Sequence, residues 1–442
     1  MGIRVLTSAA VIGLLSVGAP VLDRALPGMQ LVAAAHAQQD GAAKKQRETR
    51  RTPALRNKVY ERLAEAQAFA EAKNFGEAQG ILDDMIANDG KNALNSYELA
   101  NVFNLYAFLR YSAEDYNGAL RYYQKVISQP DIPLAMEINT RFTVAQLYFV
   151  QEQWNDGIKA LLQWFDLTDK PNANAYVLLS QGYYQIKDYD RSLENVKIAI
   201  KMYEDAGKLP KEQWYNLARF LYFDKNDMDN ALSTLRTLLY YYPKKQYWVQ
   251  ASHLYGEKKD EASQLALMET AYEQGLLDKS SELVQFSYLY LNAETPYSAA
   301  KVMAKGFKDE IIEDKSKNYE LAGSAWRQAQ ETPKAIPMME KAAAKSDEGE
   351  LYARLASVYL DGDQFDEAIK AANKGLKKGG IKRPDQTRLV LGMAYFNLGK
   401  YADARKVFRE AKKDKRSAKY ADQWIKYIQS EQDRLAQLAK DV

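Results

Sequence analysis

Small and large apolar residues recur along the chain with the spacing of helices rather than of strands. The stretch from Leu389 to Ala411 shows the pattern most clearly, and its defining positions are Gly392, Tyr395, Ala404, Phe408 and Ala411. At this spacing the small and the large residues fall on one face of each of two consecutive helices. A small residue allows two helix axes to approach within about 8–10 Å, and a ring from the partner helix fills the space beside it.

The small position of this stretch has equivalents along most of the chain. They are separated by 33 to 41 residues and are Ala66, Ala107, Ala145, Ser180, Ala218, Ser252, Ser287, Gly323, Ala356 and Gly392. Repetition of a helix pair at a nearly fixed period is typical of solenoids. We therefore predict an all-α fold, an α-solenoid or superhelix of about ten helix-turn-helix hairpins, over residues 53–416.

A second signature follows the small residue by about nine positions, where an aromatic residue precedes a small one by three. Tyr116 with Ala119 is an example, and the turn between the signatures is rich in helix breakers, as in the segment 361–363. These turns predict the end of one helix and the start of the next. The unit around Ser252 lacks the aromatic residue, so we expect a short or distorted hairpin there.

Beyond the last hairpin, Tyr420, Trp424, Tyr427 and Ile428 form one apolar stripe on a helix whose other faces are charged. Terminal repeats of solenoids need a cover with a polar outer face. Residues 417–442 are therefore predicted to form a C-terminal capping helix and tail.

The N-terminus has the pattern of an export signal. Arg4 precedes an apolar run from Val5 to Val21, and the segment ends in small residues before Gln38. This pattern predicts export to the periplasm, with cleavage of residues 1–37 after Ala37. The alternative is an uncleaved anchor helix, although the run is shorter than the ~20 residues that span a bilayer. Residues 38–52 carry five basic side chains without apolar periodicity, which predicts a disordered tether or an attachment to an acidic surface.

Composition argues against several classes of function. The net charge of +3 gives no long-range field for nucleic acid. Once the signal is removed, His253 is the single histidine, so neither a metal cluster nor a histidine-activated nucleophile is expected. The acidic runs 224–229 and 361–367 place Met228 and Phe365 where a calcium loop needs oxygen. We expect no enzyme, cofactor or metal; a hydrolase would need two buried, opposed carboxylates.

The order L-G-x2-Y followed by A-x3-F-x2-A resembles the tetratricopeptide repeat, and Trp214, Leu217, Ala218 and Pro243 match further positions of that pattern. The resemblance implies that a peptide or a protein is held in a concave groove formed by the first helices. Carried onto this chain, the groove residues are Asn101, Asn104, Phe108, Tyr111, Asn139, Phe142, Gln146, Phe149, Asn174, Gln181, Tyr184, Tyr215, Arg219, Tyr222, His253 and Tyr288.

Amide side chains at these positions both donate and accept hydrogen bonds, so a ladder of them suits the backbone of an extended partner. The alternative is that they are solvated polar groups and packing contacts between repeats. The segment YYYPKKQYW, residues 240–248, also has two interpretations. It could form a stacking surface for a sugar or nucleotide, or it could be the end of one hairpin that packs on the next.

The segment RRTPALRNKVYERLAEAQ, from Arg50 to Gln67, together with the ten-unit layout behind an export signal, resembles the periplasmic tetratricopeptide proteins associated with proteobacterial TonB systems. This resemblance implies a partner among TonB, ExbB and ExbD and a role in iron-chelate uptake. The alternative is a scaffold for cell-wall or exopolysaccharide machinery.

Overall fold

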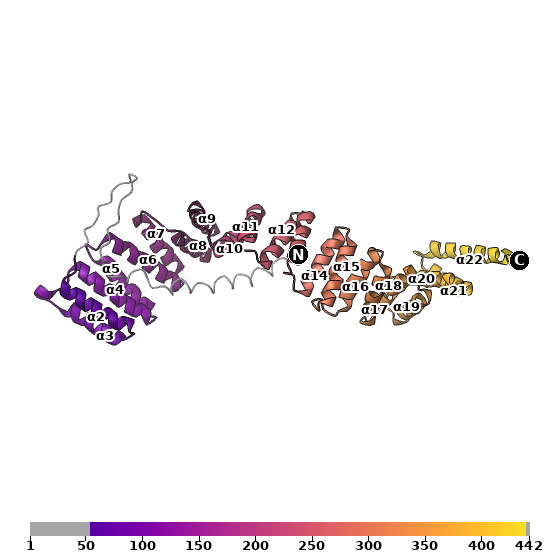
Figure 1. The fold of residues 1–442 in the computed structure, drawn as a ribbon, viewed down its shortest axis with the longest axis horizontal. Coiled ribbons are helices and arrows are strands. Elements are labelled where there is room, and N and C mark those ends of the chain that lie inside the picture. Colours follow the sequence, from indigo (N-terminus) through magenta and orange to yellow (C-terminus); the bar gives the residue numbers. More distant parts are fainter. Residues whose placement is uncertain (1–53, 439–442) are drawn as a thin grey trace. The chain divides into compact units, whose positions relative to one another are not determined.

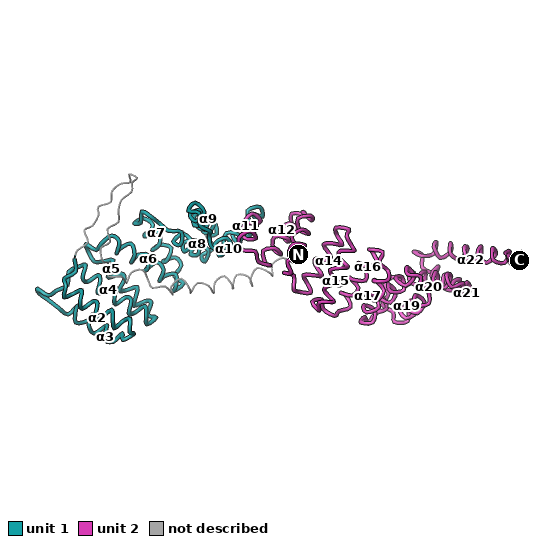
Figure 2. The backbone as a smooth tube through the Cα atoms, in the orientation of Figure 1, with its two compact units in different colours: residues 1–231 teal, residues 232–442 magenta. Residues whose placement is uncertain are grey.

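A computed structural model of the protein describes residues 54–438, and this part of the chain is all-α (Figure 1). It contains 21 α-helices, one short 3-10 helix and no strand. The predicted export signal and basic tether lie outside the described residues. The chain divides after Ala231 into two compact units, which Figure 2 distinguishes by colour.

The helices follow one another as antiparallel pairs. In the first unit they are α2 (Asn57–Glu71) and α3 (Phe75–Ala87), α4 (Ser96–Ser112) and α5 (Tyr116–Ser128), α6 (Leu134–Val150) and α7 (Trp154–Leu167), and α8 (Ala173–Gln185) and α9 (Tyr189–Asp205). The 3-10 helix η2 (Gly90–Asn92) lies between α3 and α4. Next come α10 (Glu212–Asp224) and α11 (Met228–Tyr241), and the division between the units falls inside α11.

The second unit continues the same order. Its pairs are α12 (Lys245–Glu257) and α13 (Glu261–Glu273), α14 (Ser280–Asn292) and α15 (Pro296–Lys308), α16 (Ser316–Gln328) and α17 (Thr332–Ala344), α18 (Glu350–Asp361) and α19 (Phe365–Lys378), and α20 (Pro384–Asn397) and α21 (Tyr401–Lys412). One further helix, α22 (Ala418–Leu438), follows. Ten helix pairs and a final helix within residues 54–438 confirm the predicted fold class.

Small residues allow the two helices of a hairpin to pack closely, as predicted. All ten small positions lie on first helices and are buried. In the last hairpin a Cβ atom added to Gly392 would lie 2.6 Å from the Phe408 ring. The ring is completely buried, so it occupies the space that the missing side chain leaves.

The same principle joins neighbouring hairpins. The Phe149 ring of α6 lies against Gly157 of α7 and also against Gly182 of α8, where an added Cβ atom would be 2.5 Å from the ring. One side chain therefore fixes three consecutive helices, and none of the three could be displaced without opening a cavity.

A left-handed residue ends the first helix of every described pair. The residues with positive φ in these turns are Lys73, Glu114, Glu152, Lys187, Asn226, Lys259, Glu294, Gln330, Asp363 and Gly399. The residue after each one donates a backbone hydrogen bond to the carbonyl five residues earlier, as Asp188 does to Tyr183. This Schellman motif satisfies carbonyls at the helix end, and nine of its ten left-handed residues are not glycine.

The prediction of a short or distorted hairpin around Ser252 is wrong. Helices α12 and α13 each have 13 residues, the same length as both helices of the next two pairs. Asp260 caps α13 by accepting a hydrogen bond from the Ser263 amide, and the Ser252 hydroxyl donates 3.0 Å to the Gln264 carbonyl. The turn motif and these polar contacts close the hairpin, so the aromatic residue is not required.

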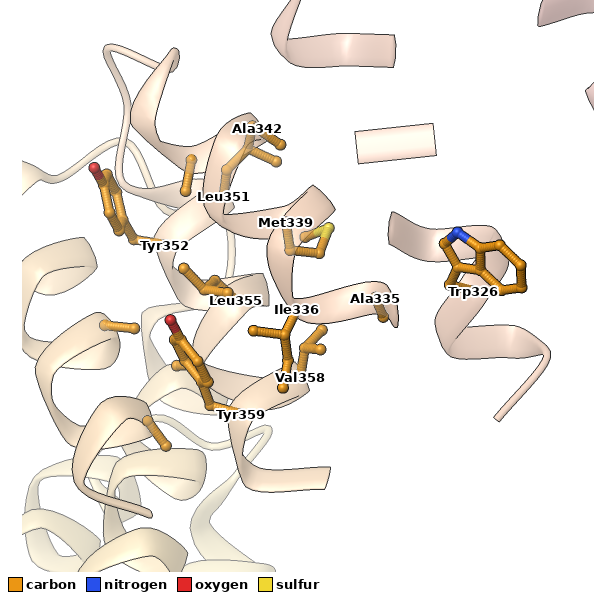
Figure 3. Close-up of a cluster of buried hydrophobic side chains, with 14 of the residues drawn as sticks. Trp326, Ala335, Ile336, Met339, Ala342, Leu351, Tyr352, Leu355, Val358 and Tyr359 are labelled. Atoms are coloured by element: carbon orange, nitrogen blue, oxygen red, sulfur yellow. The ribbon is translucent and has the colours of Figure 1, made fainter. Parts of the chain in front are cut away.

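A contiguous hydrophobic cluster runs through the middle of the second unit. Figure 3 shows Ile336 of α17 beside Val358 of α18, and Met339 and Leu355 belong to the same cluster. These side chains are buried because α17, the second helix of one hairpin, lies against α18, the first helix of the next. Each repeat therefore completes its core only with its neighbour.

Polar contacts also connect side chains about one repeat apart in the second unit. The Arg327 and Asp361 side chains pair at 2.7 Å, and so do Lys345 and Asp314. In the hairpin of α20 and α21, Asp385 is buried at the start of α20. The Arg383 guanidinium donates two hydrogen bonds to its carboxylate, and the Ser417 hydroxyl donates a third. These contacts place the connection before α20 beside the connection before α22.

Helix α22 packs against α21, and two residues of the predicted stripe, Trp424 and Ile428, lie in this contact. Ala421 and Ile428 are completely buried, and the Trp424 ring stacks on Phe408 with centroids 5.5 Å apart. The other two residues of the stripe, Tyr420 and Tyr427, are exposed at 60% and 53%, although the Tyr427 ring still contacts Phe396 of α20 with centroids 5.3 Å apart. The helix is rotated so that the small Ala421, rather than a tyrosine, meets α21.

Candidate partner-binding face

One face of every first helix stays accessible within its stack of hairpins. Counted from the buried small residue, the positions six before, one after and five after it are exposed or half-buried in each first helix from α2 to α20. The positions three before and four after are more often packed against neighbouring side chains. The accessible positions therefore form a repeated pattern along the described chain.

Three consecutive first helices of the first unit combine into an uncharged surface, which we call the neutral face. Its residues on α4, α6 and α8 are Asn101, Phe108, Ser112, Asn139, Gln146, Val150, Asn174, Gln181 and Gln185. None of the nine is ionisable, and six carry amides. Six of them were predicted from the sequence as groove residues; Ser112, Val150 and Gln185 were missed, although the position five after the small residue would have identified them.

The amides of the neutral face are available for a partner. Among residues 54–438, the side chains of Asn139, Gln146, Asn174 and Gln181 have no hydrogen-bond partner. Only Asn101 is engaged, since its Nδ2 atom donates 2.8 Å to the Tyr97 carbonyl. Amides left to water in this way retain both donors and acceptors for an incoming backbone.

The second helices present a different chemistry. On α9 the exposed positions include Asp190, Arg191, Glu194, Lys197 and Lys201. Exposed charges of both signs keep this side hydrated, and desolvating them would cost free energy. The chain therefore separates an uncharged first-helix side from a charged second-helix side in this part of the first unit.

Several predicted groove rings pack within the hairpins. Tyr111, Phe149 and Tyr184 each contact the aromatic residue that begins the second helix of the same hairpin, with centroids 5.7, 6.2 and 5.6 Å apart. Phe149 is buried, whereas the other two are half-buried. These rings stabilise the hairpin turn, so little of their surface is left for a partner.

Other predicted residues also lie in packed surroundings. The Phe142 ring contacts Trp164 at 4.8 Å, and the buried Tyr215 hydroxyl donates 2.9 Å to Glu204. Tyr222 packs against the cluster that contains Trp214. Asn104 and Arg219 are half-buried.

His253 and Tyr288 belong to the second unit, where both are exposed on α12 and α14. They occupy the same repeat position as Gln181. The segment 240–248 is also divided between exposed and buried rings, since Tyr240 is 79% exposed whereas Tyr247 is fully buried. Pro243 lies between α11 and α12, as the packed-end interpretation expects.

The described part of the Arg50–Gln67 segment has a structural role. Arg56 donates through Nε and Nη2 to the buried Glu98 carboxylate at 2.9 and 2.7 Å, and its Nη2 also reaches the Ala93 carbonyl. Burial opposes ionisation of Glu98, but hydrogen bonds from Arg56 and Asn95 outweigh it and lower the pKa of that carboxyl. This contact joins the start of α2 to the start of α4.

Two observations concern the acidic side chains of the described residues. No group of three or more histidine, aspartate or glutamate side chains among residues 54–438 is placed to hold a metal ion. Glu98 and Asp385, two acids that the described structure buries, both have a lowered pKa rather than the raised one that a catalytic acid needs. No helix in this range is both long and apolar enough to cross a membrane.

Two segments match family models of the tetratricopeptide repeat, residues 214–245 and residues 353–421. The first includes α10 and α11, and the second extends from α18 to the start of α22. A search of curated protein sequences gives no match.

Several solved structures are similar over part of the chain. A MamA protein is 22% identical over 40% of this chain and 94% of its own, with a TM-score of 0.34. YrrB, described as a TPR protein with an unusual peptide-binding site, is 14% identical over 40% of this chain and 86% of its own, with a TM-score of 0.32. The TPR2AB domain of yeast Sti1, solved as a complex with pHSP90, is 13% identical over 60% of this chain and 99% of its own, with a TM-score of 0.34.

Proposed function

Because this chain is a tetratricopeptide-repeat protein, we propose that it is a non-catalytic scaffold that binds an extended segment of another protein on the neutral face. The observation that carries the proposal is the set of nine uncharged positions on α4, α6 and α8, in which most amides have no partner of their own. An extended backbone presents one donor and one acceptor per residue, which such amides can match.

One half-buried ring adds contact area to this surface. Phe108 lies at the same repeat position as Gln146 and Gln181, and it is only half-buried. Aromatic side chains contribute large apolar area with few rotatable bonds. A partner segment with an apolar residue opposite Phe108 and an uncharged stretch opposite α6 and α8 fits this arrangement.

We further propose that the partner is a protein of the cell envelope and that the scaffold works in the periplasm. The pattern of residues 1–37 and the resemblance of the Arg50–Gln67 segment support this proposal. The specific form is an accessory of the TonB, ExbB and ExbD complex in iron-chelate uptake. Recovery of one of these three proteins with the full chain from envelope extracts would support it, and recovery of none would contradict this specific form.

The direct test of the binding face is the double substitution Asn139→Ala and Asn174→Ala. The variant loses two hydrogen bonds that are worth about 0.5–1.5 kcal/mol each, so the affinity for the partner protein should fall about fivefold or more. The matched control is Glu194→Ala with Lys197→Ala on the outer side of α9, which should leave capture unchanged. Unchanged capture by the first variant, with an unchanged melting temperature, would remove the neutral face from the proposal.

A second candidate function is a scaffold for cell-wall or exopolysaccharide machinery. The observation that favours it is the combination of uncharged amides and a ring on the neutral face, because both also suit neutral sugars. The phenotype of a deletion strain separates the two. Sensitivity to iron starvation supports the transport role, whereas altered cell shape or reduced exopolysaccharide supports the alternative.

A further inference from the structure

The small net charge of the whole chain conceals a strongly basic segment. Residues 370–419 contain sixteen lysines and arginines against four aspartates and glutamates, a net charge of +12, although the chain as a whole carries only +3. This segment covers most of α19, all of α20 and α21 and the start of α22. The charge is therefore concentrated at one end of the second unit.

Contacts bring the basic connections of this segment together. Arg383 before α20 and Arg416 before α22 both approach the Asp385 carboxylate, at 2.7 and 3.6 Å. Lys378 donates 2.6 Å to the Ser346 carbonyl in the connection before α18. The connections before α20 and α22 thus line one edge of the unit. The connection before α18 lies beside them, but it carries the exposed acids Asp347 and Glu348. We call the exposed lysines along that edge the basic edge: Lys377, Lys378, Lys382, Lys413, Lys415 and Lys419.

The two kinds of cation at this edge have different roles. The Arg383 guanidinium is engaged by the buried Asp385 through two hydrogen bonds, and Arg416 binds Asp414 in the same way. By contrast, the ammonium groups of four lysines have no carboxylate partner among the described residues, namely Lys377, Lys382, Lys415 and Lys419. The backbone amide of Lys382 does donate to the Glu350 carboxylate at 3.0 Å. Guanidinium groups recognise carboxylates with a fixed fork, whereas ammonium groups act as hydrated point charges without directional preference. The free cations are thus of the kind that suits a diffuse anionic surface.

An exposed aromatic ring accompanies the free lysines. Tyr420 follows Lys419 directly, in the first turn of α22, and is 60% exposed. Tyrosine is enriched at the interface of lipid bilayers, where its ring lies at the level of the headgroups. Lysine clusters near such a ring are attracted to anionic lipid headgroups.

We propose that the basic edge binds the surface of a bilayer rich in anionic phospholipid, with the lysines contacting headgroup phosphates and Tyr420 entering the interface. In this proposal the lysines and the ring contact the bilayer from its surface. The basic edge is distinct from the neutral face, which lies in the first unit.

The test uses the full chain with vesicles of phosphatidylcholine alone and of phosphatidylcholine with equimolar phosphatidylglycerol, at 50 and at 500 mM salt. We expect binding to the anionic vesicles at low salt and its loss at high salt, where charges separated by more than a few ångströms are screened. Each lysine near an anionic surface contributes about fivefold in affinity. The variant Lys377→Gln, Lys382→Gln, Lys415→Gln and Lys419→Gln should therefore bind at least 30-fold more weakly.

The matched control removes the same number of charges from exposed lysines elsewhere, with Lys159, Lys170, Lys197 and Lys208 each replaced by Gln. This control should bind within about threefold of the unmodified chain, since those lysines lie far along the sequence from the edge. If both variants weaken vesicle binding equally, the effect depends on net charge alone. If neither variant weakens vesicle binding, the contact lies on another segment. Either result would overturn the proposal.

A further variant tests the identity of the anionic partner. Tyr420→Ala should weaken vesicle binding several-fold without changing the affinity for polyglutamate or single-stranded DNA, because only the bilayer has an interface for the ring. If the unmodified chain ignores the anionic vesicles but binds polyglutamate or the DNA, the partner is an acidic polymer and the bilayer proposal fails.

Discussion

The Phe408 ring of α21 lies over Gly392 of α20, so closely that a Cβ atom added to the glycine would be 2.6 Å from the ring. The ring is fully buried and stacks on Trp424 of α22, so it has no free space into which to move. Two residues therefore set the distance between helices α20 and α21, and a third holds the ring from the other side.

Replacing Gly392 by alanine should destabilise the C-terminal end of the second unit. Overpacking of a well-packed core costs about 1–3 kcal/mol, and calorimetry of the full chain should show a lower melting temperature. The control is Gly80→Ala on α3, where nothing lies within 4 Å of an added Cβ atom. That change should stabilise by about 0.5–1 kcal/mol, because alanine is the better helix former. Equal effects of the two substitutions would refute the close packing.

The left-handed turn residues predict a pair of opposite effects. Lys187 and Gly399 occupy equivalent turns with φ of 63° and 73°. A side chain in this conformation costs about 1–2 kcal/mol, so Lys187→Gly should raise the free energy of unfolding by up to about 1 kcal/mol after the entropy of glycine is included. Gly399→Ala should lower it by about 1 kcal/mol. Urea titration of both variants measures the change, and a loss of stability in Lys187→Gly would contradict the turn assignment.

Asp385 predicts a dependence of stability on acid. Its carboxyl has a pKa well below the ordinary value, chiefly because Arg383 donates to it and also because Ser417 and Arg416 lie close, although burial opposes the shift. An ordinary aspartate in the unfolded chain has a pKa of about 3.9. The contribution to stability is therefore complete above about pH 4 and is lost as the pH falls toward the folded pKa.

The variant Asp385→Asn isolates this contribution. It should be about 2 kcal/mol less stable than the unmodified chain at pH 7, the usual range for a hydrogen bond to a charged group. The difference should shrink below pH 4, as the native carboxyl also becomes protonated. A difference that stays constant between pH 7 and pH 3 would show that charge at Asp385 is not the cause.

Binding on the neutral face predicts little dependence on salt. The nine positions on α4, α6 and α8 carry no charge, so partner affinity should change less than about threefold between 50 and 500 mM salt. Vesicle binding by the basic edge should fall steeply over the same range. Titration of both ligands in one salt series distinguishes the two surfaces, and a steep loss of partner affinity would assign the partner to a charged surface.

The repeat period and the small positions were predictable because they are local in sequence. Gly392 and Phe408, for example, lie 16 residues apart in two consecutive helices, and helical spacing alone puts them together. The Schellman turns were not predicted, since lysine and glutamate at the left-handed position leave no compositional signal. The regular hairpin at Ser252 was missed for the same reason, because its turn is closed by backbone hydrogen bonds.

Predictions about individual side chains depended on contacts that helical spacing does not determine. Asn139 and Gln181 remain accessible, whereas Phe149, on the same predicted face, is buried over the glycines of two other helices. The pairing of Arg56 with Glu98 spans 42 residues and has no local signature. The basic edge, by contrast, could have been found by counting charge in a window of 50 residues instead of over the whole chain.

The most direct test of the central claim places a photo-crosslinking amino acid at Gln181 of α8 and, separately, at Lys201 of α9. Gln181 is on the neutral face, and Lys201 is exposed on the second helix of the same hairpin. We predict that irradiation in envelope extracts yields a specific adduct with a partner protein from position 181 and none from position 201. Adducts from position 201 alone would contradict the assignment of the binding face to the first helices.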